Sequence, residues 1–376
     1  MKQLRNVGIS ITFALIALLI VVYARFGGGR EYTFATTTPL VKPADVERVI
    51  AYPEPIGNVA ASNDTTGPTR VFFTIHPESR PEHEKLLEIV NGQGVAYPNE
   101  AAQRRFNTIL GLYADQQHRL WVIDHGNHGT EAVRLTAFDL RTNRVVDEYI
   151  FPREVAELGS FFNDLSVSPD GRYVFVADVS FWRHRPSIAV YDTQTRRSIS
   201  RLDGHASVSS QGYVPVNPIK KMRFFSGLVD LMPGVDGLDV SPDGQYVYYA
   251  AMSHYGLFRV PVAALTNFAL SNEAVNRQVE HVAAKPLSDG IRVDRENNAY
   301  ITDIEHSGVS VVTPDGQVRT LISDPKIRWA DGLSFGGDGY TYLADSDIPD
   351  QMLQSKEHIA AHKPYYIYRF RTGVPH

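Results

Sequence analysis

Apolar and polar residues alternate in the same order through four stretches of the chain. Each stretch begins with Asn or Asp beside a turn-permissive residue, continues with an apolar alternation and a polar turn, and ends with a second apolar run. The stretches are FNDLSVSPDGRYVFVAD from Phe162, VDGLDVSPDGQYVYYAA from Val235, SDGIRVDRENNAYITD from Ser288 and ADGLSFGGDGYTYLAD from Ala330. Alternation with a period of two, interrupted by turn residues, predicts one β-hairpin in each stretch.

The spacing of these hairpins predicts a repeat architecture. The leading residues Asn163, Asp236, Asp289 and Asp331 follow one another at intervals of 73, 53 and 42 residues. A unit of about 40 to 50 residues with insertions has the length of a four-stranded propeller blade. We therefore predict an all-β fold, a six-bladed β-propeller, over residues 49–376.

The remaining blades have weaker signals. A fifth copy of the pattern, LGLYADQQHRLWVIDHG from Leu110, has Thr108 and Ile109 where the leading acid would stand. We expect the strand pair TRVFFTIHPES from Thr69 and the strand YYIYRFRT near the C-terminus to form the sixth blade together. Closing the ring in this way leaves no open sheet edge.

Two segments fall outside the hairpin pattern. The only helix that we expect after residue 30 is a short one around Glu82 to Val90. The stretch from Ser207 to Pro233 is an insertion between blades, either a cover over a site or a solvent-exposed excursion packed by Phe224 and Phe225.

The first residues have the pattern of a membrane-targeting segment. Lys2 and Arg5 precede an apolar run of 17 residues from Val7 to Tyr23. This predicts a membrane-spanning signal anchor or a cleaved signal peptide over residues 1–25, followed by a tether over residues 26–48. In both cases we expect the propeller to be exported to the cell envelope, either membrane-anchored in the periplasm or outside the cell, or secreted.

Composition excludes several classes of protein. The formal charge of −5 and the pI near 6.2 give no basic surface for nucleic acid. The absence of cysteine excludes disulfides, thiolate metal sites and a cysteine nucleophile. The sequence also lacks a phosphate-binding glycine motif, a His-Glu-x-x-His zinc helix and a Gly-x-Ser-x-Gly elbow.

The leading residues of the hairpins are the main candidates for chemistry. In a propeller they start the innermost strands, so their side chains converge on the axis. Asn163, Asp236 and Asp289 are the predicted ligands of a divalent cation, Ca²⁺ or Mg²⁺, and Asp331 adds a fourth oxygen-bearing group. The alternative is that Asn-Asp and Asp-Gly are only turn formers, with the glycine taking a torsion that other residues avoid.

Histidines and acids follow the second strands of the hairpins. The loop histidines that could rim the mouth are His76, His125, His128, His254 and His306. Of these, His254 and His306 are the preferred partners of Asp289 in moving a proton, and His125 is a candidate ligand-binding residue. The alternative is that each histidine only bonds to the backbone of its own loop. The acids that end the second strands, for which we expect a loop-capping role, are Asp124, Asp178, Asp303 and Asp345.

The order of motifs resembles the major royal jelly protein/yellow family in its bacterial form. The motifs are LWVIDHG, AFDLRTNRVVDEYIFP, SFFNDLSV, FVADVS, IAVYDTQTRRSIS, VDGLDVSPDGQYVYYAAMSHYGLFRVP and SDGIRVD, and the resemblance covers roughly residues 65–350. It implies a six-bladed propeller with an axial site. That family includes dopachrome-converting proteins and amine binders.

A more distant resemblance, to gluconolactonase/regucalcin-like lactonases, rests on the same hairpins. In those proteins a Glu at the start of the first blade, two Asn positions and an Asp hold the metal. Asn163, Asp236 and Asp289 match three of these positions, whereas Ile109 stands where the Glu is expected. Asp331 is the candidate to replace that Glu.

Two functions follow from these residues. One is an enzyme in which a divalent cation assists lactone hydrolysis or dopachrome-type tautomerisation of a small cyclic molecule. The other is a non-catalytic receptor for an amine-like ligand, in which carboxylates pair with the charge and Trp182, Tyr255 and Trp329 supply aromatic faces.

Overall fold

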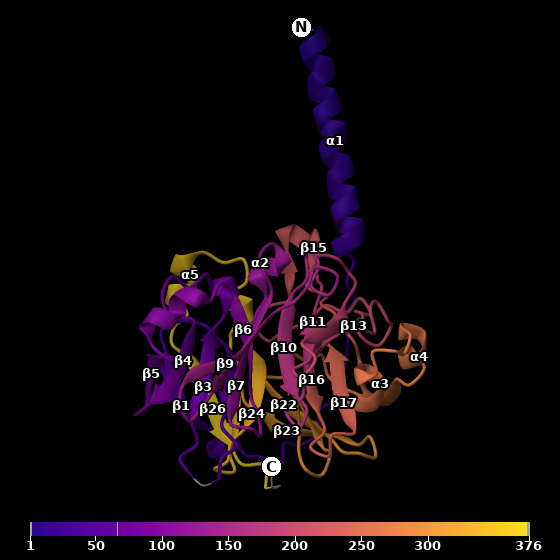
Figure 1. Cartoon of the computed structure of the whole chain (residues 1–376). Helices are drawn as coiled ribbons and strands as arrows, with labels where there is room; N and C mark the ends of the chain where they lie inside the picture. The colour runs from indigo at the N-terminus through magenta and orange to yellow at the C-terminus, as the bar shows by residue number, and fades with distance from the viewer. Residues whose placement is uncertain (1, 66, 374–376) are drawn as a thin grey trace.

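The computed structural model describes residues 2–65 and 67–373 of the 376-residue chain. A long N-terminal helix, α1 (Lys2–Phe26), projects from one face of a six-bladed β-propeller (Figure 1). Among the described residues, no helix combines the length and the apolarity that crossing a membrane requires.

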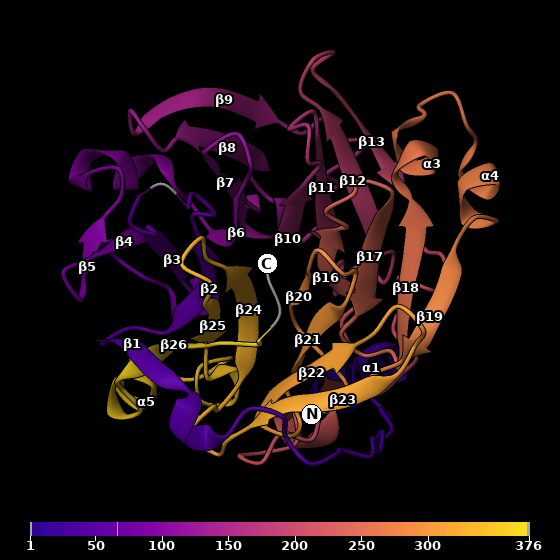
Figure 2. The same cartoon turned by 90° about the horizontal axis from the view of Figure 1, so that it is seen from below.

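The propeller is a ring of six four-stranded antiparallel sheets around a central axis (Figure 2). The first three blades are β2 (Ile56–Ala61), β3 (Val71–Ile75), β4 (Leu86–Val90) and β5 (Gln93–Ala96); β6 (Ile109–Ala114), β7 (Arg119–Asp124), β8 (Arg134–Asp139) and β9 (Arg144–Ile150); and β10 (Phe162–Val167), β11 (Tyr173–Asp178), β12 (Ser187–Asp192) and β13 (Arg197–Arg201). The fourth and fifth are β16 (Val235–Val240), β17 (Tyr246–Ala251), β18 (Gly256–Pro261) and β19 (Glu280–Ala284); and β20 (Ile291–Val293), β21 (Ala299–Asp303), β22 (Gly308–Val312) and β23 (Val318–Ser323). The sixth is β24 (Ala330–Phe335), β25 (Thr341–Asp345), β26 (Tyr365–Phe370) and β1 (Glu47–Tyr52).

The first and last strands of the propeller close the ring by pairing in the sixth blade. Strand β1 pairs with β26, with Tyr52 opposite Tyr365. The prediction that the segment from Thr69 joins the C-terminal strand in one blade is therefore wrong, because β3 belongs to the first blade. The inner strand of that blade, IGNVAA, has neither a leading acid nor an alternation and so gave no hairpin signal. The helix expected around Glu82 to Val90 is also wrong, since Leu86–Val90 is the strand β4.

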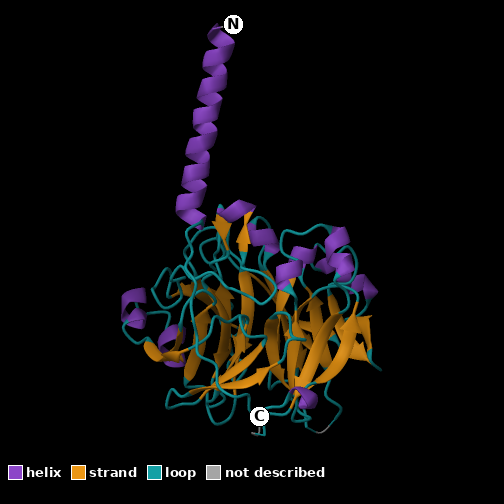
Figure 3. Cartoon of the chain, turned by 180° about the vertical axis from the view of Figure 1, so that it is seen from behind, coloured by secondary structure: helices purple, strands orange, loops and turns teal. Residues whose placement is uncertain are grey.

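Short helices and one hairpin lie in the connections, and several of them cover the face from which α1 projects (Figure 3). The α-helices are α2 (Gly126–Gly129), α3 (Val262–Thr266), α4 (Asn272–Asn276) and α5 (Lys356–Ala361). The 3₁₀ helices are η1 (Pro43–Asp45), η2 (Pro77–Ser79), η3 (Glu100–Arg105), η4 (Phe225–Gly227) and η5 (Ile348–Asp350), and the hairpin is β14 (Arg223–Phe224) with β15 (Val229–Asp230).

The hydrophobic core lies between neighbouring blades. Trp121 and Leu135 of the second blade pack with Phe162, Val176 and Tyr191 of the third in one buried cluster, and comparable clusters join the other blades. Because each sheet buries its apolar faces against its neighbours, no blade has a complete core alone.

The glycine that follows each leading aspartate lets neighbouring inner strands approach closely. A Cβ atom on Gly237 would lie 2.5 Å from the carbonyl oxygen of Asp289, and one on Gly290 would lie 2.5 Å from that of Asp331. Neither glycine has a positive φ. In the turn interpretation, glycine follows aspartate because it adopts a backbone torsion that other residues avoid. That explanation is therefore wrong for Gly237 and Gly290. The glycines leave room for the adjacent blade instead.

Residues 26–48, the expected tether, are hydrogen-bonded to the propeller at several points. The Gly29 N–H donates to Asp230 at 2.6 Å, and the Thr37 N–H donates to the Thr320 hydroxyl at 2.9 Å. The Phe26 ring packs against Phe181 with 5.7 Å between ring centres. These contacts fix where α1 leaves the propeller.

We expect Gly290→Ala to lower the free energy of unfolding by about 1–3 kcal/mol, because the added methyl group overpacks the contact with the Asp331 backbone. Gly67→Ala is the matched control, since no atom of the described residues lies within 4 Å of a Cβ atom at that position. Denaturant unfolding of both variants is the measurement. Equal stability of the two variants would contradict the close-approach explanation.

Candidate axial site

Four oxygen-bearing side chains from four consecutive blades converge at the axis. They belong to Asn163 on β10, Asp236 on β16, Asp289 just before β20 and Asp331 on β24, and we call them the axial ring. All four are buried, with 3–6% exposure, and all four line a cavity of about 280 Å³. Residues of the β14–β15 hairpin also line this cavity, which places its mouth on the face from which α1 projects (Figure 1).

Hydrogen bonds fix the orientation of the ring. The Asn163 side-chain N–H donates to Oδ1 of Asp236. The indole N–H of Trp329 donates to Oδ2 of Asp289 at 2.8 Å. Oδ1 of Asn163 is buried without a hydrogen-bond partner among the described residues. An orphaned acceptor beside three carboxyl groups fits a bound cation, because all the available ligand atoms are oxygen.

The two remaining blades contribute no charge to the ring. A register shift between the first and fourth residues of the inner strand recurs in β2, β6, β10, β16 and β24. In this register Gly57 and Leu110 are the counterparts of the ring residues. Leu110 lines the cavity, whereas Ile109 packs in the core with Leu112 and Val122. The Glu of the lactonase-like proteins stands at the start of the first blade, which in this structure is β2, so the assignment of Ile109 to that position is wrong and Gly57 stands there instead.

Burial and mutual repulsion favour protonation of the ring carboxyls. Burial raises the pKa of Asp289 to about 7, although the bond from Trp329 opposes the shift. Burial, followed by the charge of Asp289, raises the pKa values of Asp236 and Asp331 well above the usual range. Like charges in a dry site disfavour each other's ionisation. A positive charge bound in the ring would oppose these shifts and favour the ionised carboxylates.

A second polar layer lies one residue further along the inner strands. Asn58 donates from its side chain to Oδ1 of Asp164 at 2.6 Å. Burial raises the pKa of Asp164 to about 6, against the opposing effect of Arg292. The charge of Asp164 in turn raises the pKa values of the ring aspartates.

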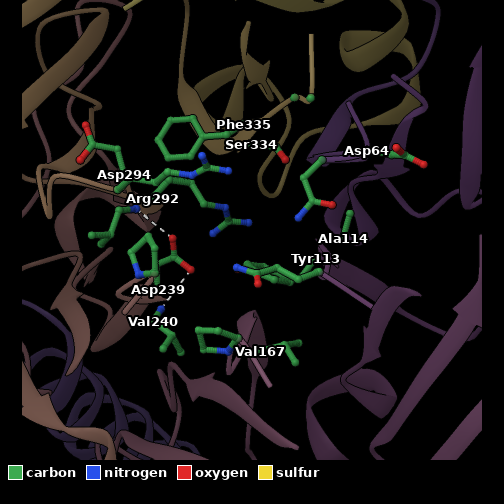
Figure 4. A pocket seen from close by; sticks show the side chains of 18 of the residues that line it. Asp64, Tyr113, Ala114, Val167, Asp239, Val240, Arg292, Asp294, Ser334 and Phe335 are labelled. Atoms are coloured by element: carbon green, nitrogen blue, oxygen red, sulfur yellow. Dashed lines mark hydrogen bonds between the residues drawn. The ribbon is translucent and has the colours of Figure 1, made fainter. Parts of the chain in front are cut away.

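A separate cavity of about 610 Å³ opens at the other ends of the inner strands, where Ala114, Val167 and Val240 end β6, β10 and β16 (Figure 4). Arg292 lies there, with its guanidinium 5.1 Å from the Tyr113 ring centre. The inner strands thus have an acidic ring at one end and a mixed-charge cavity at the other.

The walls of the axial cavity are mainly apolar. The insertion from Ser207 to Pro233 contributes Phe224, Phe225 and Leu231, so it covers the mouth, as the cover interpretation predicted. The segment after β25 adds Ile348, Met352 and Leu353, which no sequence pattern indicates as cavity residues. Trp329 is fully buried beside the ring, and Trp182, 51% exposed, stands at the rim.

The histidines that line the cavity differ from the preferred pair. His76 and His128 line the wall together with Glu78, and the carboxylate of Glu78 lies 3.5 Å from Nε2 of His128. Burial lowers the pKa of His76 to about 4, so this side chain is neutral at pH 7. His125 lies behind His128 and Phe161, and burial lowers its pKa to about 3.

The other predicted rim residues do not line the cavity. His254 is buried and accepts the Gly256 N–H at 2.7 Å. His306 pairs with Asp303 at 2.8 Å. Tyr255 packs against His254 with 5.1 Å between ring centres. All three therefore lie in the surrounding loops, and the alternative of backbone and loop bonding describes them better.

Three of the four acids that end the second strands cap the loops before the inner strands, whereas Asp303 accepts the backbone N–H groups of Glu305 and His306 in the loop that follows it. Oδ1 of Asp345 accepts the backbone N–H groups of Arg328 and Trp329 at 2.9 and 2.8 Å. Asp124 and Asp178 make the same kind of bond, to Thr108 and Phe161. The capping prediction is confirmed, and at Asp345 the cap also positions the indole that holds Asp289.

Without added cations, we expect the stability contribution of the ring to fall as pH rises. Its carboxyls have higher pKa values in the folded protein than the ~3.9 of an unfolded chain, so the folded protein holds more protons between about pH 4 and pH 7. Asp331→Asn removes one charge and should raise the free energy of unfolding at pH 8 by at least about 1.4 kcal/mol, the equivalent of one pKa unit.

Unfolding in the presence of chelator at pH 5 and pH 8 is the measurement for Asp331→Asn. The exposed Asp45, changed to Asn, is the control and should leave the pH dependence unchanged. If the free energy of unfolding changed between pH 5 and pH 8 by the same amount in the parent and in Asp331→Asn, repulsion within the ring would be contradicted.

Comparisons with known proteins agree with this architecture. The structure is similar to a gluconolactonase from Xanthomonas campestris, with a TM-score of 0.54, 15% identity and coverage of 93% of this chain and 92% of that one. It is similar to regucalcin, a calcium-binding protein from Agrobacterium tumefaciens, with a TM-score of 0.56, 14% identity and coverage of 90% and 95%. It is also similar to a luciferin-regenerating enzyme, with a TM-score of 0.56, 10% identity and coverage of 87% and 94%.

At these identities the structural similarities establish the fold alone. No curated protein matches the sequence at a significant level. The family described as major royal jelly protein matches residues 108–333, which span the second to the fifth blade and most of β24 of the sixth. The chain belongs to the major royal jelly protein family.

Proposed function

We propose that the axial ring binds one divalent cation, Ca²⁺ or Mg²⁺, and that the cavity above it converts a small cyclic molecule. The reaction is lactone hydrolysis or a dopachrome-type tautomerisation. One observation carries the proposal: three carboxyl groups and one carboxamide from four blades converge, buried, at the floor of an apolar cavity. Keeping such groups together in a dry site is costly without a task.

Asn163, Asp236 and Asp289 are the proposed ligands of the cation, and Asp331 supplies the carboxylate that neither Gly57 nor Leu110 provides. The unpartnered Oδ1 of Asn163 supports this assignment. A bound divalent cation would polarise a carbonyl oxygen and offset the charge of the ring.

Asp289 is the proposed proton acceptor. Its pKa of about 7 suits a group that exchanges a proton at neutral pH. The Trp329 N–H holds one of its oxygens, which orients the carboxyl group for transfer. On the wall, the His128–Glu78 pair is available to bond a substrate hydroxyl or carbonyl.

The size and walls of the cavity limit the substrate. A volume of about 280 Å³ is at the lower end of ligand pockets, and apolar side chains form most of the wall. A compact ring with one polar edge fits, with the polar edge toward the axial ring and the apolar face toward residues such as Phe161 and Leu231.

The second candidate is a receptor for an amine-like ligand without catalysis. The observation that favours it is the number of aromatic side chains that line the cavity, namely Phe161, Phe181, Trp182, Phe224, Phe225 and Trp329. An organic cation would pair with the ring aspartates, and its apolar body would contact these faces.

We further propose that the propeller acts outside the cytoplasm and that residues 1–25 direct its export and contact the membrane. The basic residues Lys2 and Arg5 before the apolar run support this proposal.

Calorimetric titration of the chelator-treated full-length protein with Ca²⁺ and Mg²⁺ tests the ring. We expect one site, with weaker affinity at pH 6 than at pH 8 because protons compete for Asp289. Asp289→Asn should weaken binding by at least about tenfold, since even outer-shell changes at metal sites cost about 10–100-fold. Asp45→Asn is the control and should bind as the parent does.

Ligand assays on the same proteins separate the two candidates. The enzyme should lose turnover of lactone or dopachrome substrates on chelation and in Asp289→Asn. An amine receptor should instead bind its ligand in the presence of chelator and lose affinity as salt screens the mouth. No binding of either ion at pH 8 would overturn the metal-assisted enzyme.

A further inference from the structure

Two histidines and an aspartate converge in the segment that follows β25. Asp350 ends η5, His358 lies on α5, and His362 caps the C-terminus of α5. Nε2 of His358 lies 3.0 Å from Oδ1 of Asp350, and Nε2 of His362 lies 3.6 Å from Oδ2 of the same carboxylate. A tetrahedral ion with bonds of about 2.0–2.1 Å holds its donor atoms about 3.3 Å apart, which is close to this spacing.

The two histidines have the orientation that metal ligands need. They are four residues apart on one helical face, and their rings stack with 4.2 Å between centres. Nδ1 of His362 donates to the carbonyl oxygen of His358 at 2.8 Å, which leaves the Nε2 lone pair facing Asp350. Metal-binding histidines commonly donate their other ring N–H to a backbone carbonyl in this way.

The donor set differs from that of the axial ring. Two imidazole nitrogens and one carboxylate are ligands for a transition metal such as Zn²⁺, whereas the ring offers oxygen alone. The side chains of Asp350, His358 and His362 are 17%, 37% and 36% exposed, so an ion and a fourth ligand from solvent have access.

We propose that Asp350, His358 and His362 form a transition-metal site, of the kind that Zn²⁺ fills, and that the ion holds the segment covering the axial cavity. The three ligands lie at the two ends of residues 351–357. Within that stretch Met352 and Leu353 line the axial cavity, and Leu353 is 57% exposed. An ion that joins η5 to α5 therefore fixes both ends of this part of the wall.

The site is also connected to the floor of the cavity. Nη1 of Arg328 donates to the carbonyl oxygen of His362 at 3.0 Å. The next residue, Trp329, donates to Asp289 of the ring. Helix α5 lies toward the same face of the propeller as β15 and α1 (Figure 1). The metal thus sits beside the mouth rather than within it.

Titration of the chelator-treated full-length protein with Zn²⁺, and with Co²⁺ as a spectroscopic probe, tests this site. We expect one equivalent of Zn²⁺ to bind, a visible Co²⁺ absorption of tetrahedral type that Zn²⁺ displaces, and slower proteolysis within residues 351–357. His358→Gln and His362→Gln should each weaken Zn²⁺ binding by at least about tenfold.

Two variants serve as controls. His118→Gln alters another histidine near an aspartate, at 3.7 Å from Asp64, and should leave Zn²⁺ binding unchanged. Asp289→Asn disrupts the axial ring and should also leave it unchanged, which separates this proposal from the one for the ring. The absence of Zn²⁺ binding, or equal binding by the parent and both histidine variants, would overturn the site.

Discussion

The repulsion among three buried aspartates is the interaction on which the rest of the site depends. Asp236, Asp289 and Asp331 are brought together by three adjacent inner strands, and burial alone shifts each toward the neutral form. Protons or a cation must balance the ring. Its charge state therefore links folding, ion binding and any proton transfer in the cavity.

The propeller holds the ring aspartates close together, orients them and covers them. Gly237 and Gly290 let the inner strands approach until the aspartates converge, and the blade-to-blade core holds that spacing. Asp345 caps the loop that carries Trp329, and Trp329 orients Asp289. The β14–β15 hairpin and the segment after β25 then cover the ring with apolar side chains, which keeps the site dry and strengthens the repulsion.

Much of this arrangement is predictable from the sequence, and the reasons for the misses are physical. The hairpin repeat predicts both the fold and the convergence of Asn163, Asp236, Asp289 and Asp331, because a leading residue in a repeat occupies the same place in every blade. The first blade was missed because its inner strand is uniformly apolar and small. The pattern does not select among the five loop histidines, because it places each loop at the mouth without giving the direction of its side chains. His254 and His306 turn into their own loops, whereas His76 and His128 face the cavity.

The same limit explains why the segment from Ser346 to His362 gave no signal. Its residues have no strand period, and their proximity to the ring arises only when the sixth blade closes. The sequence predicts the cover formed by the insertion before β16 as one of two alternatives, since a long loop in a compact domain either packs over a site or extends into solvent. Phe224 and Phe225 lining the cavity decide between them.

The most direct test of the central claim is a carbon-13 NMR titration of the aspartate carboxyl groups in chelator-treated protein, with assignments from Asn variants of the ring. The account predicts that at pH 7 the ring still holds at least one proton, and that saturating Ca²⁺ or Mg²⁺ releases it. Three fully ionised ring carboxylates at pH 7 without any cation would contradict the account.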